Sequence, residues 1–246
     1  MPADAHLGNA PDAPYVPAAG RAALTHAYDQ AMALTMREGR WRPALTDAVA
    51  RDLRDHGVVI DVGCGTATQS IAITRARPDA KVIGIDPDPE ILTLAAAKPG
   101  ADRVQLRVGT AAALALPSAH ADRIILSLML HHLDPAGKAA ALREARRVLR
   151  PDGQLHVLDW GTPAGPLTRA GFVALQLLDG RGNTRDHATG RWLETFDAAG
   201  LQPPRTLRRL PTAWGTLQQL VTAPSGHRPP MADPAAAPRR QGTPGP

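Results

Sequence analysis

An apolar run leads directly into a glycine turn at residues 58–66, VVIDVGCGT. Gly63 and Gly65 allow the backbone to turn tightly and to approach a ligand without an intervening Cβ. Nicotinamide and flavin enzymes also use such a turn, but the dinucleotide fingerprint requires a small residue where this chain has Thr68. Asp61 argues further against a dinucleotide ligand, because a carboxylate two residues before the turn would repel a pyrophosphate. The stretch therefore favours a ligand with a positive amino group and a sulfonium.

The segments around this turn alternate between strand and helix patterns. Short apolar runs predict five strands, at 58–62, 81–85, 104–108, 123–128 and 154–158. Helices are predicted before and between them, at 22–37, 42–55, 89–97, 137–149 and 191–199, and Thr66 or Thr68 is expected to cap one more helix after the glycine turn. The last pair, 205–210 and 215–221, has the pattern of an antiparallel hairpin. We therefore expect an α/β fold: a doubly wound, mostly parallel seven-stranded sheet with an antiparallel edge hairpin.

The length of 246 residues suits one domain with a substantial core. Residues 1–20 and the proline-rich residues 223–246 lack periodicity and are expected to be disordered, which leaves 21–222 for the folded domain. No apolar run is long enough for a membrane span, and no secretory signal is apparent. The single cysteine, Cys64, supplies neither an internal disulfide nor a multi-cysteine metal site. A cytoplasmic protein without a metal is the simplest expectation.

The net charge of +5 raises the question of a nucleic-acid partner. The 28 basic residues are spread along the whole chain, and no aromatic residues interleave with the denser clusters as a stacking surface for single strands would require. A solvated basic surface is therefore the preferred interpretation, and no nucleic-acid partner is expected. The sequence does not indicate the oligomeric state.

An acid follows the second predicted strand. Asp86 lies 21 residues beyond Gly65, where a carboxylate can accept hydrogen bonds from both hydroxyls of a ribose. The alternative is an ordinary turn aspartate before Pro87. Together with Asp61 and the two glycines, the spacing favours the ribose role.

Four stretches carry a resemblance to a known family. VVIDVGCGT at 58–66 and VIGID at 82–86 resemble the first motifs of class I S-adenosylmethionine-dependent methyltransferases. ADRIILS at 121–127 with HHL at 131–133 resembles their fourth-strand motif, and LRPDGQL at 149–155 the entry to their fifth strand. The resemblance covers about 58–161 and is nearest to the group of small-molecule methyltransferases that contains the enzymes of ubiquinone and menaquinone biosynthesis. It implies S-adenosylmethionine as the cofactor.

The resemblance also implies which residues bind that cofactor. Asp61, Gly63 and Gly65 would contact its methionine part and Asp86 its ribose, with Cys64 and Pro87 beside them. Thr110 and Ala111, after the third strand, would flank adenine, although the family usually has an acid near Thr110. The segment from Ser127 to Met129 would lie under the sulfonium.

Methyl transfer from a sulfonium is a direct displacement, so it needs a base only when the acceptor must lose a proton. His131 and His132 follow the fourth strand, where the methyl group is expected, and His132 is the candidate base. The alternative is that both histidines only shape the loop. Asp159, at the end of the fifth strand, is a candidate for contact with the acceptor, or else a loop-capping residue. Residues 162–187 form a long connection, interpreted as an irregular stretch that serves as a lid or as an extra surface helix.

The expected reaction is methylation of a small organic acceptor through oxygen, nitrogen or carbon. The chain has SLML at 127–130 in place of the Asn/Asp-Pro-Pro-aromatic motif, which argues against amino methylation of DNA bases. An alternative is a non-catalytic protein that binds the cofactor or a partner on the same fold, since no base is unambiguous. A nicotinamide oxidoreductase is disfavoured by Asp61 and by the missing third glycine.

Overall fold

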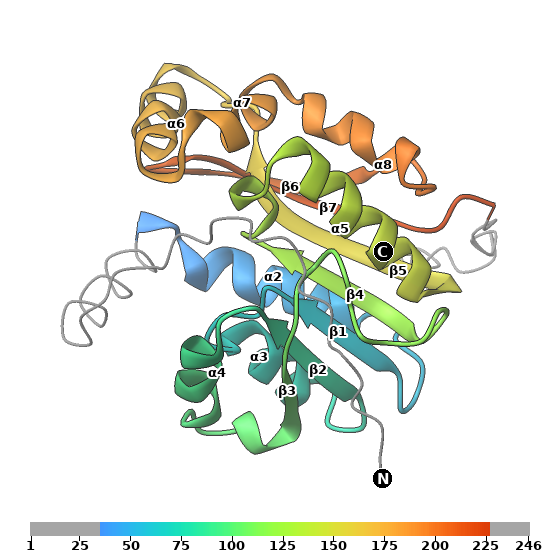
Figure 1. Ribbon diagram of the computed structural model, residues 1–246. Coiled ribbons are helices and arrows are strands. Elements are labelled where there is room, and N and C mark those ends of the chain that lie inside the picture. Colours follow the sequence, from blue (N-terminus) through green and yellow to red (C-terminus); the bar gives the residue numbers. More distant parts are fainter. Residues whose placement is uncertain (1–34, 227–246) are drawn as a thin grey trace, which may run out of the picture.

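The computed structural model describes residues 35–226, with the side chains of residues 178 and 179 left aside (Figure 1). Seven strands form one sheet in the order β3-β2-β1-β4-β5-β7-β6. They are β1 (Val58–Val62), β2 (Lys81–Asp86), β3 (Val104–Val108), β4 (Ala121–Ser127), β5 (Leu149–Gly161), β6 (Arg205–Thr212) and β7 (Gly215–Thr222). The first five run parallel, and β7 is antiparallel to both β5 and β6. The predicted α/β sheet with its antiparallel edge hairpin is confirmed.

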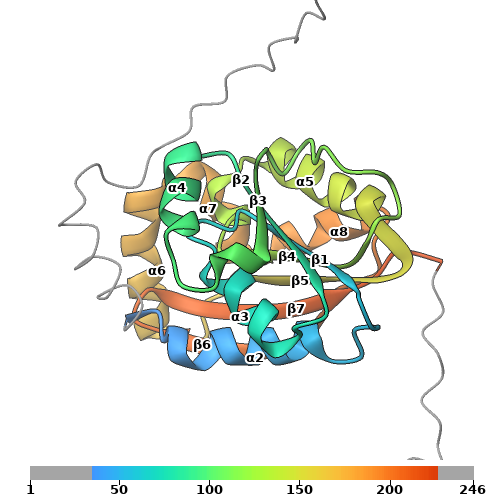
Figure 2. The same cartoon turned by 90° about the horizontal axis from the view of Figure 1, so that it is seen from below.

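Helices cover both faces of the sheet, as the edge view shows (Figure 2). The longer ones are α2 (Glu38–Ala50), α3 (Thr68–Ala76), α4 (Pro89–Ala96), α5 (Pro135–Val148), α6 (Pro166–Asp179), α7 (Arg181–Thr189) and α8 (Glu194–Ala198). Single turns η1 (Ala101–Arg103), η2 (Leu130–His132) and η3 (Arg191–Leu193) lie between them. Within residues 35–226, none of these helices has the length and apolar character needed to cross a membrane.

The core lies in two layers, one on each face of the sheet. On one face, α5 and α8 pack against alternate strand residues such as Ile60, Ile124 and Leu155. On the other, α2, α3 and α6 pack against residues such as Val59 and Leu158. Strands covered on both faces consist almost wholly of apolar residues, which is why their sequence shows continuous runs and not alternation.

Helix α2 illustrates how spacing decides which face is buried. Trp41, Leu45, Val49 and Leu53 follow one another at four-residue spacing, and all four are buried in the layer beneath β1 and β5. The helix begins and ends earlier than the predicted 42–55: left-handed Arg37, with φ 56°, precedes it, and Arg51, with ψ 130°, is extended and ends it. Residues 1–34, with most of the predicted helix 22–37, lie outside the described part of the chain, as do 227–246, so the predicted domain boundaries stay predictions.

Of the two interpretations of residues 162–187, the structure agrees with the helical one, because α6 and α7 occupy most of the segment. The predicted cap of α3 was wrong. Neither Thr66 nor Thr68 caps α3: the N-cap is Ala67, which is left-handed and makes no side-chain capping bond. The hydroxyls of Thr66 and Thr68 instead accept hydrogen bonds from Lys98 Nζ at 2.5 and 2.7 Å.

Candidate cofactor and acceptor site

The glycine turn lies at the carboxyl end of β1, between β2 and β4, where the chain order of the sheet reverses. Gly63 and Gly65 have φ of 68° and 53°. A Cβ on Gly63 would lie 2.9 Å from Cβ of Met129, so this position excludes a side chain for reasons of space as well as conformation. A Cβ on Gly65 would meet no protein atom within 4 Å. Open space beside Gly65 at a switch point is where ligands bind in sheets of this kind.

Asp86 ends β2 and holds the turn from the other side. One of its carboxylate oxygens accepts the backbone N–H of Gly65 at 2.8 Å, and the other accepts that of Asp88 at 3.0 Å. Each oxygen keeps a second acceptor site, because a carboxylate oxygen has two lone pairs. Pro87 is exposed beside it, and Asp88 caps α4. Asp86 is thus fixed by the backbone with acceptor capacity to spare, which fits a ribose diol.

Asp61 is completely buried in β1. Ser70 Oγ donates to its Oδ2 at 2.6 Å, whereas Oδ1 has no partner among the described residues. Burial raises the pKa of Asp61 to about 6, against the opposing effect of the Ser70 hydrogen bond. A buried polar atom without a partner is rare and requires an explanation. The bare oxygen fits a cationic donor such as the amino group of S-adenosylmethionine.

Cys64 lies inside the turn and is buried. Burial, and then the charges of Asp61 and Asp86, raise the pKa of its thiol far above the usual range. Its Sγ would be 3.0 Å from a Cβ built on Gly84, so the sulfur packs against β2. The thiol therefore stays protonated and serves packing rather than nucleophilic attack.

The other predicted cofactor residues surround the same edge of the sheet. Gly109 N donates to Asp86 O at 3.0 Å, which brings the end of β3 to the end of β2, and Thr110 and Ala111 follow it. Thr110 is exposed, and Ala111 and Ser127 are half-buried. Met129 reaches Gly63 across the turn after β4, where Leu128 is left-handed with φ 55°. The structure thus gathers the predicted cofactor set, Asp61 to Met129, at one edge, while the contacts themselves stay predictions.

A buried network of polar side chains lies beyond β4. Asp159 is fully buried and accepts the N–H groups of Leu130 and Trp160 at 2.9 and 2.7 Å. His131 Nδ1 donates to its Oδ1 at 2.8 Å. Burial alone would raise the pKa of Asp159, but His131 outweighs it and holds that pKa well below the usual range. Asp159 is therefore an ionised carboxylate enclosed by protein donors.

His132 lies next to this network and keeps exposed surface. Its ring centroid is 4.0 Å from that of His131. Partial desolvation of the ring by surrounding protein atoms, and then the neighbouring His131, lower the pKa of His132 to about 4. The ring is consequently neutral at pH 7 and can accept a proton. Asn183 Nδ2 donates to the backbone oxygen of His132 at 2.9 Å, so α7 is attached to this loop.

Sequence reasoning missed three features of the site. Ser70, one turn into α3, is the partner of Asp61, and nothing but its distance from the glycine turn could have indicated it. His131 is the partner of Asp159, although only His132 was singled out. Buried Lys138 forms an ion pair with Asp186 at 2.7 Å and so joins α5 to α7. The last two are contacts between elements far apart in the chain.

Comparison with known proteins agrees with this geometry. The fold is that of class I methyltransferases: the solved structure of CalO1, a methyltransferase in calicheamicin biosynthesis with SAH bound, matches with a TM-score of 0.60 at 23% identity, over 84% of this chain and 59% of that one. The structure of YcgJ from Bacillus subtilis matches with a TM-score of 0.56 at 24% identity, over 69% and 70% of the two chains. Residues 59–153 match the model of a family described as "Methyltransferase domain".

Two curated relatives are similar in sequence. The ubiquinone/menaquinone biosynthesis C-methyltransferase of Syntrophotalea carbinolica is 32% identical over 52% of this chain and 53% of its own. The demethylmenaquinone methyltransferase of Deinococcus radiodurans is 30% identical over 61% of this chain and 63% of its own. The chain thus spans between half and two thirds of these relatives. These similarities support the predicted methyltransferase class and S-adenosylmethionine as its cofactor.

Proposed function

We propose that this protein transfers the methyl group of S-adenosylmethionine to a small organic acceptor and leaves S-adenosylhomocysteine. The observation that carries the proposal is the pair of acids beside the glycine turn. Asp61 presents a buried oxygen without a partner in residues 35–226, and Asp86 is fixed by two backbone donors. The bound cofactor supplies an electrophilic methyl group on a sulfonium. Since its amino group and ribose are the parts that need acceptors, both acids suit it.

The chain's own residues would bind and orient the reactants. Asp61 would bind the amino group of the cofactor and Asp86 its ribose, and the loop from Ser127 to Met129 would lie under the sulfonium. Such positioning is the main requirement of a direct displacement. His132, neutral at pH 7, is the base for an acceptor that must lose a proton. Asp159 is too deeply buried to serve as a base, so we assign it to positioning through His131.

The acceptor is proposed to enter between the turn η2 and the helices α6 and α7. Contacts between α7 and η2 include the bond from Asn183 to His132, so α7 lies next to the candidate base, and α6 packs against α7. We therefore assign α6 and α7 the role of shaping the acceptor pocket. We also propose a cytoplasmic protein, because a chain with one buried thiol and no disulfide is typical of a reducing compartment.

Calorimetry with S-adenosylhomocysteine tests the cofactor site. We expect Asp86→Ala to weaken binding by about tenfold or more, because two hydroxyl hydrogen bonds to a carboxylate are lost. Asp102→Ala is the matched control, since Asp102 is an exposed aspartate in η1. Equal affinity in the wild type and Asp86→Ala would refute the proposed cofactor geometry.

A screen of metabolite extracts with isotopically labelled methyl donor tests the reaction. A labelled product that depends on the protein identifies the acceptor. Cofactor binding without any labelled product would favour the alternative of a non-catalytic binding protein. The two experiments together separate failure of the cofactor site from failure of catalysis.

A further inference from the structure

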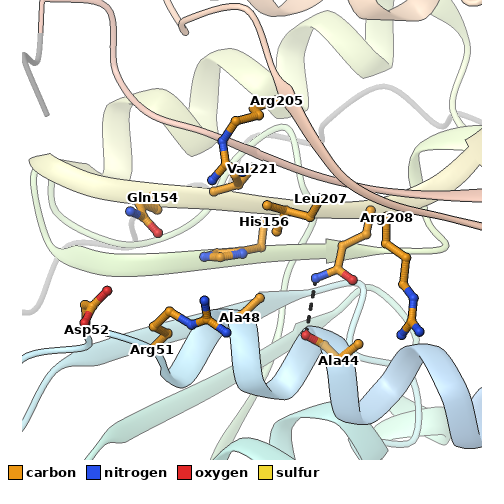
Figure 3. Close-up of a pocket in the computed structure, with 11 residues that line it drawn as sticks. Ala44, Ala48, Arg51, Asp52, Gln154, His156, Arg205, Leu207, Arg208 and Val221 are labelled. Atoms are coloured by element: carbon orange, nitrogen blue, oxygen red, sulfur yellow. Dashed lines mark hydrogen bonds between the residues drawn. The ribbon is translucent and has the colours of Figure 1, made fainter. Parts of the chain in front are cut away.

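A cavity lies at the end of the parallel strands opposite to the cofactor residues. It has a volume of about 360 Å³ and lies between α2 and the strands β5, β7 and β6 (Figure 3). Its floor includes Gln154 and His156, near the start of the paired part of β5, whereas Asp159 lies toward the strand's other end. The volume is in the range of small-molecule sites. Nothing in the proposed methyl transfer uses this cavity.

His156 is the most unusual residue of this cavity. It is 1% exposed, and neither ring nitrogen has a hydrogen-bond partner among the described residues. Burial, and then the charge of Arg123, lower the pKa of His156 to about 3, so the ring is neutral. A neutral imidazole still carries one N–H donor. A buried donor without an acceptor costs about 1–3 kcal/mol unless a water or a ligand satisfies it.

The charged groups around His156 are mostly positive. Arg51 from α2 and Arg205 and Arg208 from β6 line the cavity, and Asp52 is its one acid. Arg208 donates to the backbone oxygen of Arg40 at 3.2 Å. In the described chain, the guanidinium groups of Arg51 and Arg205 have neither an ion pair nor a hydrogen bond. Figure 3 shows both reaching from opposite sides toward His156.

Arg123 adds a further positive charge next to the cavity. It is buried, and its guanidinium donates to the backbone oxygens of Arg51, Asp52 and Asp122. These bonds hold the end of α2 in place, so that Arg51 is anchored through its backbone while its side chain is left without a partner. The arrangement is a preformed site of positive potential rather than a set of scattered surface arginines.

From this geometry we infer that the cavity binds the phosphate group of a small phosphate monoester. Three arginines against one aspartate leave an excess of two positive charges, which matches the charge of a monoester near pH 7. Guanidinium forks and an imidazole N–H are donors, and a phosphate offers three acceptor oxygens that point in different directions. The remaining volume accommodates a small organic group. This site is separate from the cofactor site, and the inference does not depend on methyl transfer.

Calorimetry with the full chain at low salt tests the site, with glycerol 3-phosphate and inorganic phosphate as probes. We expect glycerol 3-phosphate to bind and the double variant Arg51→Gln, Arg205→Gln to weaken it by about tenfold or more. Arg209→Gln is the matched control. Arg209 is an exposed arginine next to Arg208 on β6 and faces the other side of the strand, so we expect a change below about twofold.

Ring nitrogen spectra of the nine histidines give a second readout that does not depend on the arginine variants. His156→Gln identifies the His156 signal, and we expect glycerol 3-phosphate to shift that signal. Binding of S-adenosylhomocysteine is expected to be unchanged in the arginine double variant. The inference fails if millimolar glycerol 3-phosphate neither binds nor shifts the His156 signal. It also fails if Arg209→Gln weakens binding as much as the double variant, or if only a single-stranded oligonucleotide binds.

Discussion

Two carboxylates are completely buried near the carboxyl ends of parallel strands, Asp61 in β1 and Asp159 in β5, and the protein surrounds them differently. Asp159 accepts hydrogen bonds from three backbone N–H groups and from the ring of His131. Asp61 accepts from Ser70 alone and leaves one oxygen without a partner in the described chain. Their pKa values shift in opposite directions, upward for Asp61 and downward for Asp159.

The difference shows how to distinguish a structural acid from a ligand site at equal burial. Burial penalises a charged carboxylate in both places, and only nearby donors offset that penalty. At Asp159 the fold supplies the donors itself. At Asp61 it supplies one, and the missing interaction is left for a ligand. The predictions below test this contrast, from the largest effect to the smallest.

Removing the satisfied carboxylate should cost the most stability. We expect Asp159→Ala to lower the free energy of unfolding at pH 7 by about 3–5 kcal/mol, because it leaves the His131 ring and three backbone N–H groups without their acceptor. Urea unfolding followed by circular dichroism measures the loss. Asp102→Ala, at an exposed site, should change stability by less than about 0.5 kcal/mol. A loss below about 1 kcal/mol for Asp159→Ala would show that the network is not structural.

Removing the charge of Asp61 should raise the free energy of unfolding, whereas removing Asp159 lowers it. The pKa of Asp61 is about 6 in the folded protein and about 3.8 in the unfolded chain. The folded protein therefore favours the protonated form of Asp61. This contribution to stability is full below pH 3.8, declines as the pH rises, and is lost above about pH 6. The loss amounts to about 3 kcal/mol. We expect Asp61→Asn to remove this decline, so that the variant gains on the wild type between pH 4 and pH 7.

Unfolding in urea at several pH values, without cofactor, measures this gain. Because other groups also titrate, the quantity to compare is the difference in the free energy of unfolding between Asp61→Asn and the wild type at each pH. A difference that is constant between pH 4 and pH 7 would refute the assignment. Saturating S-adenosylhomocysteine should reduce the decline in the wild type, since a cationic amino group next to Asp61 favours its ionised form.

The sequence predicted the half of the molecule around Asp61 far better than the half around Asp159. Asp61, Gly63 and Asp86 lie at fixed spacings from strands with continuous apolar runs, so local pattern places them at one edge of the sheet. The strand β1 has the predicted bounds, and the order of elements through β5 follows from their alternation.

The environment of Asp159 could not be predicted in the same way. Its donors come from the turn after β4 and from His131, and its neighbour His187 comes from α7, in a connection for which the sequence left both a lid and an extra helix open. Polar and glycine-rich segments such as 180–190 have weak helix signals, and tertiary contacts such as the buried pair of Lys138 and Asp186 favour the helix there. Which acid is satisfied depends on such long-range contacts, which leave no local pattern.

The smallest change sharpens the contrast most directly, because it alters the one donor that Asp61 has. Ser70→Ala removes the hydrogen bond that favours the ionised form, so the pKa of Asp61 should rise further. The decline in stability should then extend to higher pH, and its total size should grow by about 1 kcal/mol. The measurement is again urea unfolding against pH, now as a double-mutant cycle with Asp61→Asn. In the Asp61→Asn background, Ser70→Ala should leave the pH dependence unaltered, because the titrating group is gone. If the shift persisted there, Ser70 would act on another group, and the open oxygen of Asp61 would no longer explain the pH dependence of this site.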